Sequence, residues 1–113
     1  MQTLRHTAAF DQAAGVLTEG ELDDALDTIA RNPECGDLIP GTGGVRKLRI
    51  AAGGRGKRGG ARMIFWYFDE ENPIYLLTVF AKNERSDLSA AERNALKKLT
   101  AAMKAEMRRR RPR

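Results

Sequence analysis

The distribution of apolar and polar residues along this chain predicts four strands. Segments 45–52, 61–68 and 74–81 are rich in apolar, β-branched or aromatic residues, and glycine, proline and aspartate separate them. A shorter segment, 3–6, is a candidate for the first strand. Only short connections join the last three strands, which favours an antiparallel meander.

Helical periodicity predicts two helices before these three strands and one helix after them. A short helix begins near residue 10. Thr18 and Glu21 then have the spacing of a capping box, and the apolar residues that follow recur along one helical face. Ser89 and Glu92 repeat this spacing and predict a last helix, whose apolar stripe comprises Leu96, Leu99, Met103 and Met107.

The elements follow in the order β-α-α-β-β-β-α, which predicts one α+β domain over residues 1–113 with a small antiparallel sheet. We expect the helices to be packed on one face of the sheet, because small sheets commonly leave the other face to solvent. Leu48 and Ile50 would point to the covered face, and Lys47 and Arg49 to the open face. The basic residues at about 109–113 are expected to be a disordered tail.

Positive charge is concentrated in the middle of the chain. The chain has a net charge of +5, yet residues 1–43 have a net charge of −6. Residues 44–68 contain seven basic residues and no acidic ones. Such a segment suggests a polyanionic partner such as nucleic acid, although a merely solvated basic face accounts for the same charge.

Several classes of site do not fit the sequence. The glycine-rich segment GGRGKRGG is not a Walker loop, because it leads into a strand and not into a helix. One cysteine, Cys35, and one histidine, His6, leave no intramolecular disulfide and no usual zinc site. We expect no metal and no other cofactor. The chain shows no signal peptide and no membrane-spanning run, so the expected compartment is the cytoplasm.

The remaining chemistry is a set of cations that a meander brings together. Clustered cations stabilise the dianionic transition state of phosphoryl transfer, and RNA carries its own nucleophile in the 2′-hydroxyl. The glycines would allow close approach to a nucleotide, although a flexible hairpin loop that only keeps the edge soluble is an open alternative. Aromatic residues stack on bases in many RNA-binding proteins. The candidate RNA-binding residues are Arg46, Arg55, Lys57, Arg58, Tyr67 and Arg85.

Three stretches, GDLIPGTGGVRKLRIA, GRGKRGGARMIFWYF and IYLLTVFAKNERSDLS, resemble the HigB-like branch of the RelE toxins. These proteins are the toxins of bacterial type II toxin–antitoxin systems. The resemblance covers about residues 20–100. It implies a small sheet with two N-terminal helices and one C-terminal helix, in agreement with the order of elements above.

The resemblance also implies an activity. It implies an mRNA interferase, an endoribonuclease that cleaves mRNA in the ribosomal A site without metal and so inhibits translation. It implies neutralisation by an antitoxin, often a helix-turn-helix DNA-binding protein. Lys47 and Arg49 match the basic pair of the family, and Arg62 matches its transition-state arginine. With a basic residue at the end of the last strand, the candidate catalytic residues are Lys47, Arg49, Arg62, Lys82 and Asn83.

The chain departs from the family pattern at two positions. Asn83 stands where better-known relatives have a second arginine, and Leu88 stands where some have a catalytic tyrosine. Lys47 is then the preferred general base, and Glu84 is a weaker candidate. Two other functions stay open, a gyrase inhibitor like the related ParE toxins and a non-catalytic RNA- or ribosome-binding module.

Overall fold

The computed structural model describes residues 2–54 and 59–110, and this part forms one five-stranded sheet flanked by helices. The strand order across the sheet is β1-β5-β4-β3-β2. A 3₁₀ turn, Ala14–Val16, joins the first two helices. The elements are β1 (Leu4–His6), α1 (Ala8–Ala13), α2 (Glu19–Arg31), β2 (Asp37–Leu38), β3 (Val45–Ile50), β4 (Ala61–Trp66), β5 (Ile74–Ala81) and α4 (Ala90–Arg110).

The sheet is mixed, although the three central strands form the predicted antiparallel meander. Strands β3, β4 and β5 pair antiparallel, whereas β1 pairs parallel with β5. The Ile74 N–H donates to the Thr3 carbonyl at 2.8 Å, and the Thr7 N–H donates to Leu76 at 3.2 Å. The expectation of a wholly antiparallel sheet was therefore wrong at this edge. The apolar pattern shows that a segment is a strand but not whether it runs parallel or antiparallel to its neighbour, because the alternation of side chains is the same in both cases.

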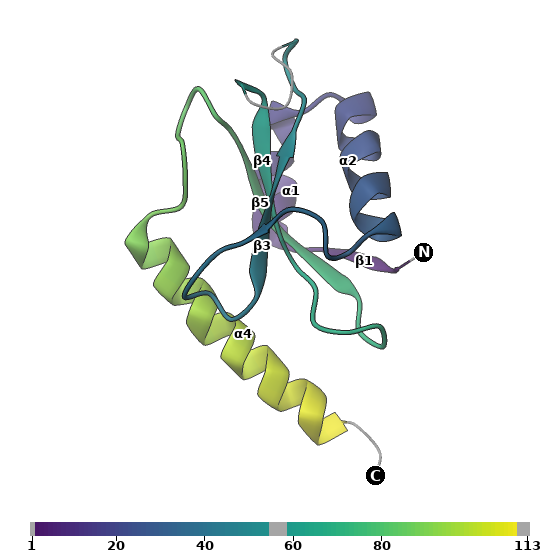
Figure 1. The fold of residues 1–113 in the computed structure, drawn as a ribbon, viewed down its shortest axis with the longest axis vertical. Helices are drawn as coiled ribbons and strands as arrows, with labels where there is room; N and C mark the ends of the chain where they lie inside the picture. Colours follow the sequence, from purple (N-terminus) through teal and green to yellow (C-terminus); the bar gives the residue numbers. More distant parts are fainter. Residues whose placement is uncertain (1, 55–58, 111–113) are drawn as a thin grey trace.

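Helices cover both faces of the sheet, which corrects the expectation that they pack on one face. Figure 1 shows the sheet nearly edge-on, with α1 and α2 on one side and α4 on the other. Strand β4 explains this arrangement because all six of its residues are buried. Met63 and Phe65 belong to the apolar cluster under α1 and α2, and Ile64 and Trp66 belong to the cluster under α4. The α+β class itself is confirmed.

Both predicted capping boxes are present. The Thr18 hydroxyl accepts from the Glu21 N–H, and the Glu21 carboxylate accepts from the Thr18 N–H. Ser89 and Glu92 make the equivalent pair of bonds at the start of α4. Each box satisfies N–H groups that would otherwise lack a partner in the first helical turn. The starts of α2 and α4 are thus fixed by local sequence.

Helix α4 agrees with its predicted apolar stripe at three positions out of four. Leu96, Met103 and Met107 pack against the apolar cluster beneath the helix, whereas Leu99 is 44% exposed. The helix also extends further than expected, because Arg109 and Arg110 are helical and not part of a disordered tail. Residues 111–113 of that predicted tail lie outside the described residues.

A buried polar contact fixes α4 on the sheet. The Thr100 hydroxyl donates to the Thr42 carbonyl at 2.8 Å, and both residues are buried. Gly43 beside them has φ of +77°, and a Cβ there would collide with the Thr100 hydroxyl. Glycine is thus required for both conformation and space. The Trp66 indole N–H donates to the Gly43 carbonyl at 3.2 Å. These contacts hold α4 over one end of the sheet, whereas Leu88 and Arg85 of the connection between β5 and α4 pack near Phe80 at the other end.

Candidate nucleic-acid interface

The α4-facing side of the sheet carries a row of basic side chains at the end away from the contact between Thr42 and Thr100. Arg49 of β3 lies directly opposite Arg62 of β4, and Arg62 lies opposite Phe80 of β5. Lys47 is on the same face of β3 as Arg49, because side chains two residues apart in a strand share a face. Leu48 packs on the opposite side of the sheet, as predicted. Strand pairing therefore brings Lys47, Arg49 and Arg62 together.

Arg62 is the buried member of this row. Its residue surface is 4% exposed, and Nη1 donates to the Ala61 carbonyl at 3.0 Å. Burial lowers the pKa of Arg62, and the positive charge of Arg49 lowers it further, while Asp87 opposes both effects. The guanidinium still carries its charge at neutral pH, because arginine titrates far above that range. A cation placed in a low-dielectric wall acts more strongly on a nearby anion than one in water does.

Asp87 places a carboxylate among these cations. Its Oδ1 lies 3.4 Å from Nζ of Lys47 and accepts from the Leu88 N–H at 2.8 Å. Burial raises the pKa of Asp87, but the Leu88 N–H, Lys47 and Arg93 outweigh burial, so the pKa lies below its ordinary value. Asp87 is therefore ionised at neutral pH.

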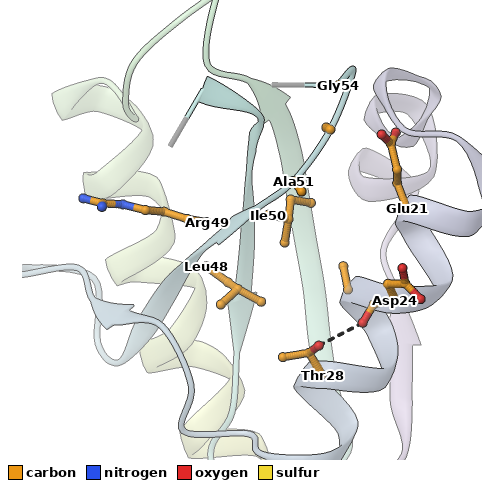
Figure 2. Close-up of a pocket in the computed structure, with 10 residues that line it drawn as sticks. Glu21, Asp24, Thr28, Leu48, Arg49, Ile50, Ala51 and Gly54 are labelled. Carbon is orange, nitrogen blue, oxygen red and sulfur yellow. Dashed lines mark hydrogen bonds between the residues drawn. The ribbon is translucent and has the colours of Figure 1, made fainter. Parts of the chain in front are cut away.

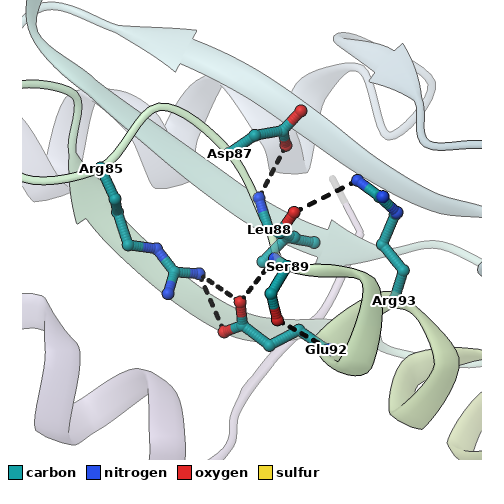
Figure 3. A network of polar contacts seen from close by, with 6 residues as sticks. All are labelled: Arg85, Asp87, Leu88, Ser89, Glu92 and Arg93. Atoms are coloured by element: carbon teal, nitrogen blue, oxygen red, sulfur yellow. Dashed lines mark hydrogen bonds and ion pairs between the residues drawn. The ribbon is translucent and has the colours of Figure 1, made fainter.

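Arg85 lies over the aromatic ring of this row. Its guanidinium carbon is 4.7 Å from the Phe80 ring centroid, within the range of a cation–π contact. The same guanidinium donates to both Glu92 oxygens, at 2.8 and 2.9 Å, as Figure 3 shows. Arg85 and the Ser89 N–H lower the pKa of Glu92. The 82–89 segment is thereby attached to the first turn of α4.

An open groove of about 390 Å³ runs beside this row, and its volume is in the range of small-molecule sites. Three of its charged residues, Asp37, Asp87 and Arg93, were not expected there from the sequence. Arg93 lies in the first turns of α4 and donates to the Leu88 carbonyl at 3.2 Å. The sequence signal that could have placed Arg93 near this site was its position four residues after Ser89, the residue that caps α4. The lining residues are Asp37, Leu38, Ile39, Pro40, Lys47, Arg49, Asp87 and Arg93.

Lys82 and Asn83 lie in the turn after β5, at the same end of the sheet as Arg62. Ala81 pairs with Ala61, and the Lys82 N–H donates to the Gly60 carbonyl at 3.0 Å. Both side chains are exposed. The strand ends thus place Lys82 and Asn83 next to the start of β4, as the meander predicts.

Two of the predicted RNA-binding residues lie away from the groove. Nη1 of Arg46 donates to the Glu34 carbonyl at 2.7 Å, so this cation holds the connection after α2. Tyr67 follows β4 and packs against the apolar cluster under α1 and α2. Burial raises the pKa of Tyr67, and neighbouring carboxylates raise it further, which is a poor setting for a polyanion. Three further candidates, Arg55, Lys57 and Arg58, lie outside the described residues.

A second cavity, of about 410 Å³, lies on the other face of the sheet between α2 and β3. Figure 2 shows Glu21, Asp24 and Thr28 of α2 on one wall, with the Thr28 hydroxyl bonded to the Asp24 carbonyl. Leu48 and Ile50 of β3 contribute to the opposite wall, whereas the Arg49 side chain points away towards α4. Its acidic and apolar lining does not suit a polyanion.

Within residues 2–54 and 59–110, no three His, Cys, Asp or Glu side chains group so as to hold a metal ion. In the same part of the chain, no helix has the length and apolar character needed to cross a membrane.

The fold and the groove define a small α+β protein with a groove at one end of its sheet that is lined by the basic residues Lys47, Arg49 and Arg93. Residues 5–110 match the family model described as the RelE toxin of the RelE/RelB toxin–antitoxin system. The chain therefore belongs to the RelE toxin family. It is the toxin of a toxin–antitoxin system, and its partner is an antitoxin.

Proposed function

We propose that this toxin is a ribosome-dependent mRNA endonuclease whose active site is the basic groove. The observation that carries the proposal is the pairing of Arg49 with the buried Arg62 on the face beside the groove. Two adjacent guanidinium groups have no structural need for one another, and each repels the other. A phosphate between or above them removes that repulsion.

The chemistry that suits this arrangement is attack of a 2′-hydroxyl on the adjacent phosphorus. The new bond joins the 2′-oxygen to phosphorus, and the bond from phosphorus to the 5′-oxygen breaks, which leaves a 2′,3′-cyclic phosphate. Arg62 and Arg49 stabilise the dianionic five-coordinate transition state, and Lys47 adds a third positive charge. The 2′ proton passes to an acceptor in the groove. Lys82, at the end of the neighbouring strand, donates a proton to the leaving 5′-oxygen.

The exposed Arg85 side chain supports binding of single-stranded RNA. Phe80 lies in the row beside Arg62, and the Arg85 guanidinium covers it at 4.7 Å. A planar guanidinium stacked on a ring presents its other face to a nucleobase. Ribosome dependence rests on the family to which the chain belongs. The decoding site would supply mRNA already bent for in-line attack, and the open groove leaves room for such a large partner.

Mapping of transcript ends after brief expression of the toxin in a bacterium tests this function. We expect new 5′ ends inside translated codons, and we expect them to disappear when translation initiation is blocked. Intact transcripts with DNA damage would instead indicate a gyrase inhibitor. Intact transcripts with salt-dependent ribosome binding would indicate a non-catalytic binding module.

We further propose that the antitoxin is a helix-turn-helix DNA-binding protein that masks the basic groove or restrains α4. Either contact prevents entry of the toxin into the ribosome. Hydrogen exchange of the toxin with and without its antitoxin measures this directly. Protection that is absent from both the groove and α4 would contradict the proposal.

A further inference from the structure

The proposed function leaves one charged side chain of the groove unexplained. Asp87 is a carboxylate in a groove proposed to bind a phosphate, and it lies 3.4 Å from Lys47. A carboxylate there weakens the binding of RNA, because it neutralises one cation and repels the phosphate. A carboxylate at this position is explained only if it contributes to the reaction or to the local fold.

The geometry leaves one oxygen of Asp87 available to a ligand. The bonds from the Leu88 N–H and the ion pair with Lys47 both involve Oδ1. Figure 3 shows the other carboxylate oxygen pointing away from Leu88. The side chain is 46% exposed and lines the groove together with Arg49 and Arg93. One oxygen thus fixes the carboxylate, and the residue as a whole forms part of the groove wall.

The two residues first considered as general base fit this role less well. Lys47 is an ammonium that faces a carboxylate, and an ammonium has no lone pair with which to accept a proton. Glu84 is an exposed residue of the turn after β5, and it is not among the described residues that line the groove. Asp87 lies 3.4 Å from Lys47, and its charge acts on Arg62, so it is near two of the cations that would hold the phosphate.

We propose that Asp87 is the general base that removes the proton from the 2′-hydroxyl, an inference that rests on the proposed endonuclease function. Oδ2 of Asp87 takes the proton as the 2′-oxygen forms its bond to phosphorus. The electrons of the broken bond stay on the 5′-oxygen, which receives a proton from Lys82. Asp87 then returns its proton to solvent through the open groove and Lys82 regains one from solvent, so both groups return to their starting forms.

The surroundings keep Asp87 in the form that a base requires. Lys47, Arg62 and Arg93 face it from β3, β4 and α4, and their charges favour the carboxylate over the neutral acid. Asp37 lines the same groove from β2 and has the opposite influence. The ionised form is therefore always present at neutral pH. The positive charges that keep Asp87 ionised also make it a weaker base. The same charges offset this loss by stabilising the transition state.

The test is single-turnover cleavage of mRNA on purified ribosomes programmed with a sense codon in the A site. Asp87→Asn keeps the size of the side chain and an oxygen that accepts from Leu88, but it cannot take a proton. We expect cleavage to slow by about 10²- to 10⁴-fold, the usual contribution of a general base. Binding to the ribosome should be unchanged or tighter, because a negative charge is lost. Asp23→Asn, an exposed carboxylate on α2, has the same change in charge and should cleave like the parent.

Two comparisons separate a base from a residue that only positions Lys47. If Asp87 acts through Lys47, then Asp87→Asn has no further effect in a Lys47→Ala background, whereas loss of a base slows that variant again. A substrate with sulfur in place of the 5′-oxygen has a leaving group that needs no proton. That substrate should rescue Lys82→Ala and should leave Asp87→Asn slow.

Cleavage by Asp87→Asn at the parent's rate, or faster, would overturn the assignment, as would equal losses of binding and cleavage. Loss of cleavage in Glu84→Gln but not in Asp87→Asn would transfer the role to Glu84. A parent protein that leaves ribosome-bound mRNA intact would overturn the endonuclease function itself, and the base assignment with it. The parent's own activity thus distinguishes the two failures.

Discussion

The two ends of the α4-facing side of the sheet are built from the same strands and have opposite characters. At one end, Val45 and Trp66 are fully buried beneath α4. At the other end, Arg49 and Arg62 occupy the equivalent strand positions four residues along, and α4 does not extend over them. We call these the covered end and the open end.

The comparison shows that the role of a buried residue in β4 depends on which segment of the chain packs over it. Trp66 and Arg62 are both almost inaccessible, at 1% and 4% exposed. The Trp66 indole has a carbonyl partner and apolar neighbours, so its burial stabilises the fold. Arg62 carries a charge next to Arg49 and close enough to Asp87 to interact with it, and burial strengthens its effect on a nearby anion. Each variant described next alters one end of the sheet and leaves the other unchanged.

The largest effect is expected at the covered end. Trp66→Ala should lower the free energy of unfolding by about 3–5 kcal/mol, because it removes a large buried side chain and leaves a cavity. Trp66→Phe keeps an aromatic ring but loses the bond to the Gly43 carbonyl, so it should cost less. Urea unfolding followed by circular dichroism measures both variants. Equal stability of Trp66→Ala and the parent would show that α4 does not depend on this contact.

At the open end, Arg62→Ala should abolish toxicity while the protein still folds and binds its antitoxin. A preorganised charge contact is worth about 3 kcal/mol in the transition state, so cleavage should slow roughly a hundredfold or more. Arg46→Ala removes a cation from the same sheet at a position away from the groove, and it should retain cleavage. Growth after induction and in vitro cleavage report the effect. Full toxicity of Arg62→Ala would remove this arginine from the site.

The contact that positions α4 offers a smaller test of the covered end. Thr100→Val leaves the Thr42 carbonyl buried without its donor, which costs about 1–3 kcal/mol. Thr28→Val provides the control, because the Thr28 hydroxyl also bonds a helical carbonyl but is exposed on α2. Thermal unfolding should show a clear decrease for Thr100→Val and little change for Thr28→Val. A similar decrease in both would mean that burial of the bond contributes nothing.

The smallest effect concerns acid stability at the open end. Arg85 and the Ser89 N–H lower the pKa of Glu92, so its contribution to stability is present above about 4.5 and is lost as pH falls below that value. Glu92→Gln should therefore be less stable than the parent at pH 7 by up to about 1 kcal/mol, typical of a surface ion pair. The difference should shrink as pH decreases towards 3. Arg85→Gln should show the same loss, and the double variant should lose no more than either.

Much of the fold was predictable because its signals are local. The capping boxes at Thr18 and Ser89 gave the starts of α2 and α4, and the apolar run at residues 74–81 gave β5 with its observed limits. Strands β3 and β4 each end two residues earlier than predicted, at Ile50 and Trp66. Tyr67 looked like a strand residue because it is aromatic, but it leaves the sheet for an acidic loop.

Only some residues of the groove could be predicted from the sequence, again because sequence signals are local. Lys47, Arg49 and Arg62 come from neighbouring strands, so alternation and the meander were enough to bring them together. Asp87 and Arg93 come from the β5–α4 connection and the start of α4. Their positions depend on where that helix lies, which no local pattern reports. Arg46 was grouped with its neighbours in sequence, although adjacent strand residues point to opposite faces.

Apart from the two-residue strand β2, which was not predicted, the sequence by itself determined the elements, the alternation of β3 and the charge of its second face, because spacing, capping and side-chain period act over a few residues. Only the tertiary structure decided that α4 crosses to the face opposite α1 and α2. That choice depends on the buried contact between Thr42 and Thr100, residues 58 positions apart, and on the space that Gly43 leaves for it. Contacts between distant residues form only once the chain is folded, and here they set the boundary between core and groove.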